Sequence, residues 1–297
     1  MPSWASVLYD VAVRSLKASS LNQHEYILPI VPVLDLMIGQ IVLAEGGNRD
    51  QYLPVNSKLT RSSQPLDVAK AMFQQTGCDW ICLADIDSFS GAAPAWHVYG
   101  QLLEAGFGIW VDANWLKDDR FRQLTDKMPA LDRLRVIVSS ETMVDQTQFD
   151  VFGKLTAMGV RPIFSLDMKG SDVIGGSAEI AQQAPLDLVA RAEDAGVKDL
   201  IVLNLSLVGT LQQDIDQTQA ATMDLIQSIV KKFPEVYVTS GGGVASAEDA
   251  QAWLDAGCDH VLAASAIHQC RITPYDMSEL ILGSEKDRLP SGSSKLN

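Results

Sequence analysis

The sequence predicts an α/β protein of the (β/α)8 TIM barrel class, built from two half-barrel repeats and preceded by a helical N-terminal extension. Eight apolar runs rich in β-branched residues alternate with amphipathic helical segments. Eight such pairs in about 250 residues are typical of a barrel. A doubly wound open sheet is the main alternative, and it is disfavoured because no Gly-x-Gly-x-x-Gly follows the first run.

The strands are expected where the apolar runs lie, and Pro32 excludes a helix interior in the first of them. They cover Ile27–Asp35, Trp80–Asp85, Phe107–Asp112, Leu134–Ser139, Arg161–Asp167, Leu200–Asn204, Glu235–Ser240 and His260–Ala264. The helices are expected at Gln64–Thr76, Ala95–Ala105, Asp118–Met128, Gln146–Met158, Pro185–Ala195, Gln217–Phe233, Ser246–Ala256 and near Pro274–Leu282. Several helices end on a glycine that can adopt the left-handed C-cap conformation, namely Gly77, Gly106, Gly159, Gly196 and Gly257.

Three parts of the chain follow from this pattern. Residues 1–25 carry apolar side chains at helical spacing and are expected to form an extension packed on the body. Residues 26–283 form the barrel. Residues 284–297 are polar and rich in turn formers, as in a flexible tail.

An internal repeat supports two half-barrels. The stretch Pro32–Gly39 resembles Pro162–Gly170, and the aspartates in them, Asp35 and Asp167, are 167 − 35 = 132 residues apart. Likewise Gly-Cys-Asp leads into a strand at residues 77–79 and again at 257–259. The first and fifth strands therefore correspond, and in a barrel of eight they stand opposite each other.

Composition limits the partners. The formal net charge of −14 and a pI of about 4.6, without any dense Lys/Arg run, argue against a nucleic-acid partner. No stretch is long and apolar enough for a membrane span, and no signal peptide is recognised. Four cysteines without a CxxC pair suggest a reducing cytoplasm. A small phosphorylated metabolite remains compatible, because backbone N–H groups can hold phosphate locally. The sequence gives no oligomeric state.

The strongest candidates for chemistry are Asp35 and Asp167. Active sites of barrels gather at the C-terminal ends of the strands. Two carboxylates on opposite sides of a bound molecule suit proton transfer by one base and one acid. The alternative is that both are solvated strand ends. Further polar residues at strand ends or just beyond are Asp85, Asp112, Ser139, Lys169, Asn204 and Ser240.

A glycine-rich loop follows the expected seventh strand. Gly241, Gly242 and Gly243 precede a helix, at a place where barrels often hold phosphate through backbone N–H groups. The alternative is a plain turn with Ser246 as a helix N-cap. After the eighth strand, Ala264 and Ser265 offer a small side chain and a hydroxyl to the same region.

Two long loops and the histidines are weaker candidates. The loop from Gly170 to Ala184 suits a substrate-covering lid, and the loop from Gly46 to Gln64 carries basic residues that suit an anion. Plain solvation is as good an explanation for each. The histidines and the Asp85–Asp87 pair match no metal-ligand spacing, so no metal and no cofactor are expected.

Together these residues resemble the histidine-biosynthesis barrels over about residues 28–281. The resemblance is closest at Val31–Gly39, Val138–Ser140, Pro162–Gly170, Gly209–Gln212 and Gly241–Ser246, and it favours the isomerase branch over the cyclase branch. It implies an Amadori aldose-to-ketose rearrangement without a cofactor, with Asp35 as general base and Asp167 as general acid. Asn204 stands where the family has a threonine lining the site. Expected substrate or phosphate contacts are Ser139, Asn204, Gly209, Thr210, Ser240, Gly241, Gly242, Gly243, Ala264 and Ser265, with Asp85, Asp112 and Lys169 as further possibilities.

The departures from the family pattern concern the phosphates. Asp112-Ala113-Asn114-Trp115 replaces a glycine loop and its arginine after the third strand, and Ala264-Ser265 replaces a Gly-Arg pair. Leu43 and Val208 replace a basic and an acidic residue. One phosphate site is therefore expected to be lost and the other altered, so that the substrate carries a single phosphate or ribotide group. Two other functions stay open: a repurposed paralogue in another pathway, such as pterin-type cofactor biosynthesis, and a non-catalytic phosphate-binding barrel.

Overall fold

The computed structural model describes residues 27–43, 52–128, 130–209 and 215–288 of the 297-residue chain. Four expectations lie wholly or partly outside the described residues: the helical extension over residues 1–25, the first part of the basic loop at residues 46–51, the contact at Thr210, and the end of the tail at residues 289–297. No helix within the described ranges has the length and apolar character needed to cross a membrane.

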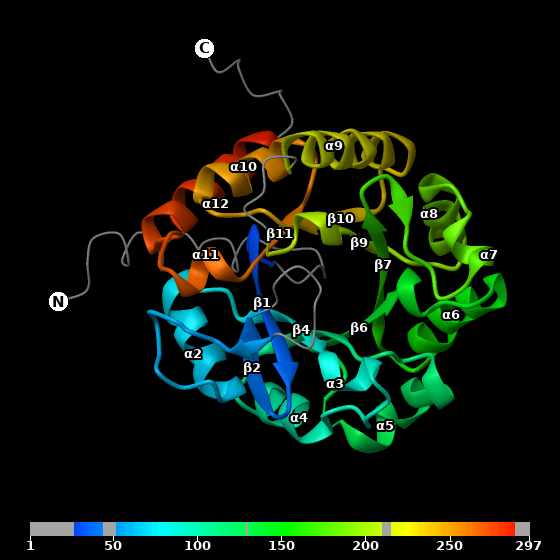
Figure 1. Ribbon diagram of the computed structural model, residues 1–297, viewed down its shortest axis with the longest axis horizontal. Helices are drawn as coiled ribbons and strands as arrows, with labels where there is room; N and C mark the ends of the chain where they lie inside the picture. Colours follow the sequence, from blue (N-terminus) through cyan, green and yellow to red (C-terminus); the bar gives the residue numbers. More distant parts are fainter. Residues whose placement is uncertain (1–26, 44–51, 129, 210–214, 289–297) are drawn as a thin grey trace, which may run out of the picture.

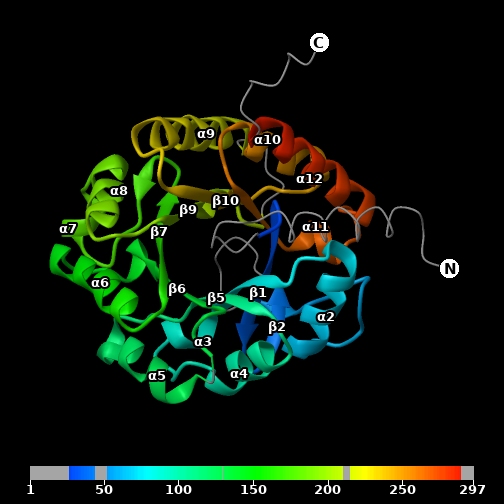
Figure 2. The same cartoon turned by 180° about the vertical axis from the view of Figure 1, so that it is seen from behind.

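Eight parallel strands of the described chain form a closed barrel, and the expected fold class is confirmed (Figures 1 and 2). Pairing runs in the order β1, β4, β5, β6, β7, β9, β10 and β11, and β11 pairs with β1 to close the ring. The strands are β1 (Ile30–Met37), β4 (Trp80–Asp85), β5 (Gly108–Asp112), β6 (Leu134–Ser139), β7 (Arg161–Lys169), β9 (Asp199–Asn204), β10 (Tyr237–Gly241) and β11 (His260–Ala263).

The helices surround this barrel. They are α2 (Pro65–Thr76), α3 (Ile86–Phe89), α4 (Trp96–Glu104), α5 (Leu124–Lys127), α6 (Asp150–Ala157), α7 (Ala178–Ala181), α8 (Pro185–Asp194), α9 (Ile215–Lys232), α10 (Ala247–Asp255), α11 (Ser265–His268) and α12 (Pro274–Arg288). Short 3-10 turns are η2 (Lys117–Gln123), η3 (Ser140–Thr142), η4 (Gln146–Phe149) and η5 (Leu205–Leu207). The five C-cap glycines all have positive φ, between 68° and 106°.

Three helices differ from expectation. The segment expected as one helix over Gln146–Met158 begins as the 3-10 turn η4 and continues as the α-helix α6. The segment expected as one helix over Asp118–Met128 is the irregular turn η2 followed by the single turn α5, because Asp118 and Asp119 have φ of 52° and 53°. The buried Arg120 side chain fixes this turn by donating to the carbonyls of Ser88 and Gly91. The last helix, α12, continues past Leu282 to Arg288, so the first residues of the expected tail are helical.

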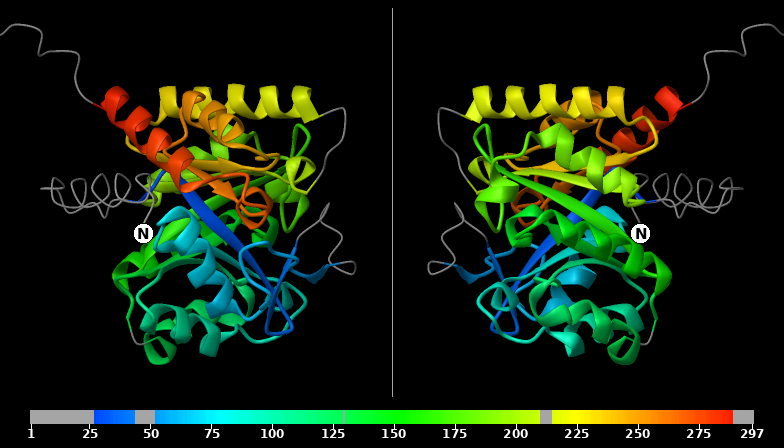
Figure 3. Two further views of the ribbon diagram at one scale, coloured as in Figure 1. Left: turned by 90° about the vertical axis from the view of Figure 1, so that its left-hand side faces the viewer. Right: turned by 90° about the vertical axis from the view of Figure 1, so that its right-hand side faces the viewer.

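The half-barrel repeat is visible in the strands that carry the two aspartates. Each of these strands turns back into a short antiparallel partner: β1 pairs with β2 (Gln40–Leu43), and β7 pairs with β8 (Asp172–Val173). β2 in turn pairs with β3 (Leu53–Pro54). The side views in Figure 3 show both hairpins at the same end of the barrel, where the parallel strands end.

The opposite end of the barrel is filled by large side chains and buried charges. Arg135 lies over the rings of Trp80 and Trp110, with its guanidinium carbon 4.8 and 5.4 Å from their centroids. Asp199 bonds both Arg135 and Arg161. Trp80 and Trp110 are both buried. This packed floor leaves the C-terminal end of the strands as the place for a site.

Candidate active site

The register of the barrel places Asp35 and Asp167 at the same height. The strand register can be followed around the ring from Asp35 and extended beyond the first residues of β11 and β1. It then returns to Ile27, just before β1, a shift of 35 − 27 = 8 residues, which is the shear of a standard eight-stranded barrel. Each strand therefore shifts by one residue relative to a level plane. The first four pairs lead from Asp35 to Ile163 on β7, and four residues beyond Ile163 is Asp167.

Alternation along each strand decides which acids face the interior. Asp35 pairs with Ala84, and Ala84 pairs with Asp112, so the side chains of Asp35 and Asp112 lie on the same face. Leu36 and Asp85 pair on the other face, toward the helices. The interior acids at the strand ends are thus Asp35, Asp112 and, across the barrel, Asp167.

Asp167 is buried among hydroxyl groups. Its two carboxylate oxygens accept hydrogen bonds from Ser139 Oγ at 2.5 Å and Ser165 Oγ at 2.8 Å, and its backbone N–H donates to Ser140 Oγ at 3.0 Å. Only 5% of the residue is exposed. Burial raises the pKa of Asp167 to about 6, although the two serine hydroxyls act in the opposite direction. A carboxyl group with this pKa can carry a proton near neutral pH.

Asp35 and Asp112 share the opposite side of the interior with Cys82. The Cys82 thiol is buried, and burial together with the negative charges of Asp112 and Asp35 raises its pKa well above the usual range. Both acids are half-buried. Asp112 lies two residues below the level of Asp35, so it is the deeper of the two acids. The departure from the family pattern after β5 thus adds negative charge to this side.

The glycine-rich segment lies at the height of the two carboxylates. Asp167 pairs with Leu203, and Leu203 pairs with Gly241, so the level position beyond β10 is Gly243. A Cβ at Gly241 would meet the Leu262 carbonyl at 2.5 Å, and one at Gly242 would meet Leu207 Cβ at 2.8 Å. Packing alone therefore requires two of the glycines. The predicted N-cap is present, because Ser246 Oγ accepts from the Asp249 N–H.

Several predicted contact residues have structural partners. Asn204 is 1% exposed, and its amide bonds both backbone groups of Gly170 and the hydroxyl of Thr222. The residue of β9 on the interior face is Leu203, which pairs with Asp167. Asn204 thus holds the turn after β7 against α9, and its predicted place in the site lining stays a prediction.

Ser240 and Ser139 also differ from simple phosphate ligands. Ser240 is fully buried and donates to the Val202 carbonyl. Ser139 binds Asp167 and accepts from the Glu141 N–H. The remaining members of the predicted set, Gly209, Ala264, Ser265 and Lys169, are half-buried or exposed, and their contacts with a substrate stay predictions.

The Asp85–Asp87 pair lies outside the interior. Asp85 accepts from the Tyr99 hydroxyl and from the Ala95 N–H at the start of α4. Asp87 accepts from the Ile38 N–H at 2.6 Å, in the β1–β2 turn where Ile38 has a φ of 50°. Both carboxylates hold neighbouring segments in place, which accounts for the motif without chemistry. Within the described ranges, no cluster of three or more His, Cys, Asp or Glu side chains could hold a metal ion.

The loop expected as a lid is packed against the end of β6. Gly176 N–H donates to the Ser140 carbonyl, and Ser177 Oγ donates to the Val144 carbonyl. A Cβ at Gly176 would lie 2.6 Å from the Met143 carbonyl. This contact explains the glycine at position 176, and it places the loop beside Ser140, whose hydroxyl binds the Asp167 backbone.

Sequence reasoning missed Ser165 and Ser140 as members of the site. Ser165 lies two residues before Asp167 on the same strand face, and it pairs directly with Ser139 on β6. The signal was the alternation along β7, which places every second residue before Asp167 on the same face.

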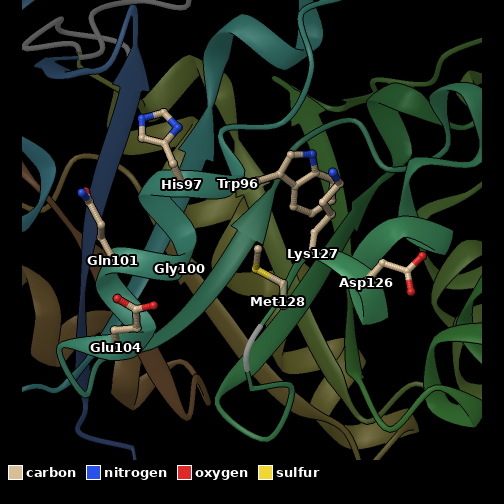
Figure 4. A pocket seen from close by; sticks show the side chains of 8 residues that line it. All are labelled: Trp96, His97, Gly100, Gln101, Glu104, Asp126, Lys127 and Met128. Carbon is tan, nitrogen blue, oxygen red and sulfur yellow. The ribbon is translucent and has the colours of Figure 1, made fainter.

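A surface groove of about 490 Å³ lies away from these residues, between α4 and α5 (Figure 4). Trp96 and Met128 form its apolar part, and Gly100 leaves the helix surface open. Its charged rim consists of Glu104, Asp126 and Lys127. The groove contains none of the interior acids, so it is separate from the candidate active site.

The fold and the acids define a class: a (β/α)8 barrel with two opposed carboxylates at the C-terminal ends of its first and fifth strands. The family model described as "Histidine biosynthesis protein" matches residues 29–273, and the chain belongs to that family.

Two kinds of relatives match nearly their full length. An uncharacterized protein of Methanocaldococcus jannaschii is 28% identical over 256 residues, covering 86% of this chain and 98% of the relative. A 1-(5-phosphoribosyl)-5-((5-phosphoribosylamino)methylideneamino) imidazole-4-carboxamide isomerase of Shewanella sediminis is 25% identical, covering 80% of this chain and 92% of the relative. An isomerase with the same description from Parvibaculum lavamentivorans is 25% identical, covering 86% and 98%. The divergence from the isomerases agrees with the altered loops described above.

Proposed function

We propose that this protein is an isomerase that acts on a small phosphorylated sugar or ribotide by acid–base chemistry, with Asp35 as the base and Asp167 as the acid. The observation that carries the proposal is the level, opposed placement of the two carboxylates at the C-terminal ends of β1 and β7. Membership of the histidine-biosynthesis family and the isomerase relatives support the reaction type.

The proposed reaction is an aldose-to-ketose rearrangement. Asp167 donates its proton to the ring oxygen of an aminoaldose as the bond between C1 and that oxygen breaks, which leaves an open-chain iminium ion. Asp35 removes the proton from C2, which gives a neutral enolamine. Asp35 then returns a proton to C1 while the C2 hydroxyl gives its proton to Asp167, so the C2 ketone forms and both carboxyl groups return to their starting states. Each proton that leaves a carboxyl group is replaced by one from the substrate, so one acid and one base suffice for the chemistry.

The proposed orientation of the substrate follows from the charges around the two acids. The phosphate end lies toward Gly243 and Ser265, because backbone N–H groups of a glycine segment can approach an anion closely. The other end lies toward β5, where Asp112 adds negative charge. A second phosphate on that side would be repelled, so we expect a single phosphate or ribotide group.

The test is a turnover assay of the purified full-length protein. The substrates are the ribotide named for the isomerase relatives and a panel of phosphorylated aldoses and aminoaldoses. The reactions are run in D2O, so that NMR detects exchange of the C2 proton with solvent as well as formation of product. We expect turnover of at least one monophosphorylated compound. Asp35→Asn and Asp167→Asn should each lower kcat by at least about 100-fold, in line with the usual contribution of general acid–base groups.

A matched control separates chemistry from loss of charge. Asp255→Asn removes an exposed acid from α10, whose side chain accepts from Gln251, and should keep turnover near the parent level. Undiminished turnover in Asp35→Asn would refute the assignment of the base. Failure of every phosphorylated compound to bind or react would refute the proposed substrate class.

A further inference from the structure

We propose that Ser139 and Ser165 are positioning residues for Asp167, because their hydroxyls hold its carboxyl group in the orientation from which it donates a proton. That Asp167 donates a proton to a substrate rests on the proposed function. The two serines are direct partners across β6 and β7, on the same face as Asp167. Their two hydroxyl groups lie next to the carboxyl group of Asp167.

Each serine hydroxyl binds a different oxygen of the carboxyl group. Ser139 Oγ donates to Oδ2 and Ser165 Oγ donates to Oδ1. The Ser139 hydroxyl is itself oriented, because its oxygen accepts the Glu141 N–H at 3.1 Å. Two donors on two oxygens fix both the position and the plane of the group, in the way that bidentate hydrogen bonding does.

This arrangement leaves capacity for the transferred proton. A carboxylate oxygen has two lone pairs, and each serine occupies one of them. The proton of the acid can therefore sit on a remaining lone pair while both serines stay bonded. The Asp167 backbone is held separately, since Ser140 Oγ accepts its N–H and donates to the Ile174 carbonyl at 2.7 Å. Orientation of the carboxyl group is thus left to Ser139 and Ser165.

The two hydroxyls also influence the charge of Asp167. Hydrogen bonds donated to a carboxylate favour its ionised form, so both serines lower the pKa that burial raises. Glu141, from the segment after β6, acts in both directions: its negative charge raises the pKa of Asp167, and its backbone N–H lowers it. The other charged groups around this end of β7 are the exposed Lys169 and Asp172, which pair in register, and Asp35 across the barrel. Removing a serine donor should therefore raise the pKa of Asp167 further.

The decisive variant is Ser165→Ala, because the hydrogen bond of the Ser165 hydroxyl within the described chain goes to Asp167. The 13C NMR titration of aspartate carboxyl groups, with the Asp167 signal assigned by its loss in Asp167→Asn, gives the pKa directly without a substrate. We expect Ser165→Ala to raise this pKa by about one unit, the effect of losing one hydrogen bond to a charged group. Ser139→Ala should move it in the same direction, and Ser165→Thr, which keeps a hydroxyl, should restore the parent value.

Kinetics test the orienting role on a substrate that the parent enzyme turns over. Ser165→Ala should lower kcat about tenfold or more with KM within about twofold, and the high-pH limb of the profile should move up with the NMR pKa. The control is Ser278→Ala, which removes a buried hydroxyl that donates to the Pro274 carbonyl in α12. It should leave the pKa and kcat unchanged.

The outcomes separate this proposal from the proposed function. An unchanged or lowered Asp167 pKa in Ser165→Ala, with the protein folded by circular dichroism, would overturn the positioning role even if the parent protein is an active isomerase. If Ser165→Ala raises the pKa of Asp167 but the parent protein turns over no compound, the hydrogen bonds from the serines are supported and the isomerase proposal is refuted. If Ser165→Ala does not fold, the same measurements on Ser139→Ala decide.

Discussion

Asp35 and Asp167 stand level with each other on opposite strands of the barrel, because a shear of eight residues over eight strands shifts the strand register by four residues over half the ring. Their surroundings differ. Asp167 is buried and accepts hydrogen bonds from two serine hydroxyls, and burial raises its pKa to about 6. Asp35 is half-buried beside Asp112 and Cys82. Two acids in different environments suit two different roles.

The first prediction concerns the pH dependence of turnover. An acid must carry its proton to donate it, and Asp167 loses its proton as the pH rises through about 6. We therefore expect kcat/KM to fall above about pH 6, with a limb that moves upward in Ser165→Ala. The measurement is a pH–rate profile from pH 4.5 to 9. A rate that stays constant across this range would count against Asp167 as the acid.

The second prediction concerns stability and the same residue. The folded-state pKa of Asp167 is raised above the 3.8 of an ordinary aspartate, so its contribution to stability is fully present below that value and is lost as the pH rises through about 6. Asp167→Asn removes this cost and should stabilise the fold by about 3 kcal/mol at pH 8, but not at pH 4. Urea unfolding at both pH values measures the difference. Asp255→Asn is the control, and equal effects of Asp167→Asn at the two pH values would contradict the prediction.

The third prediction separates two kinds of glycine. At Gly242, where φ is 97°, a Cβ would lie 2.8 Å from Leu207 Cβ, so Gly242→Ala should destabilise the fold by about 2–4 kcal/mol. Gly153 lies exposed in α6, and a Cβ there would have no atom within 4 Å, so Gly153→Ala should stabilise by about 0.5–1 kcal/mol. Thermal unfolding of the two variants should show shifts of opposite sign.

The fourth prediction concerns the floor of the barrel. Asp199→Ala removes the carboxylate that bonds both Arg135 and Arg161 and leaves two guanidinium groups without it. Breaking a buried pair in this way should cost about 3–5 kcal/mol. Arg122→Ala breaks the exposed pair with Asp119 and should cost no more than about 1 kcal/mol. Denaturant unfolding compares the two, and similar losses would show that the floor is not held by its charges.

The fifth prediction concerns Asp85, which ends β4 but faces the surrounding helices and not the barrel interior. Tyr99→Phe removes the hydroxyl that donates to Asp85, whose pKa burial raises. We expect a loss of about 1–3 kcal/mol at pH 8, because the ionised carboxylate loses a donor, and a smaller loss once Asp85 is protonated at low pH. Tyr275→Phe, at an exposed tyrosine, should have little effect at either pH. A loss that is independent of pH would mean that packing and not Asp85 carries the effect.

The sequence by itself determined the barrel and the identity of its two central acids. Apolar runs and C-cap glycines are local signals, and the strands β4 and β6 begin and end where these signals predict. The repeat of Pro32–Gly39 at Pro162–Gly170 identified Asp35 and Asp167 and assigned them to corresponding strands, since duplicated half-barrels keep equivalent residues in equivalent places. Local signals were misleading where a long-range contact decides, as in the turn that Arg120 fixes to the carbonyls of Ser88 and Gly91.

Only the tertiary structure decided how the polar residues at the strand ends divide between interior and exterior. Asp85 and Asn204 end their strands as Asp112 does, yet they bond Tyr99, Gly170 and the helices outside, because register and shear set which face a strand end turns inward. The two serines that bind the Asp167 carboxyl group come together because Ser139 pairs with Ser165 across β6 and β7, although they are 165 − 139 = 26 residues apart in the chain. Burial raises the pKa of Asp167, and this burial exists only in the closed barrel.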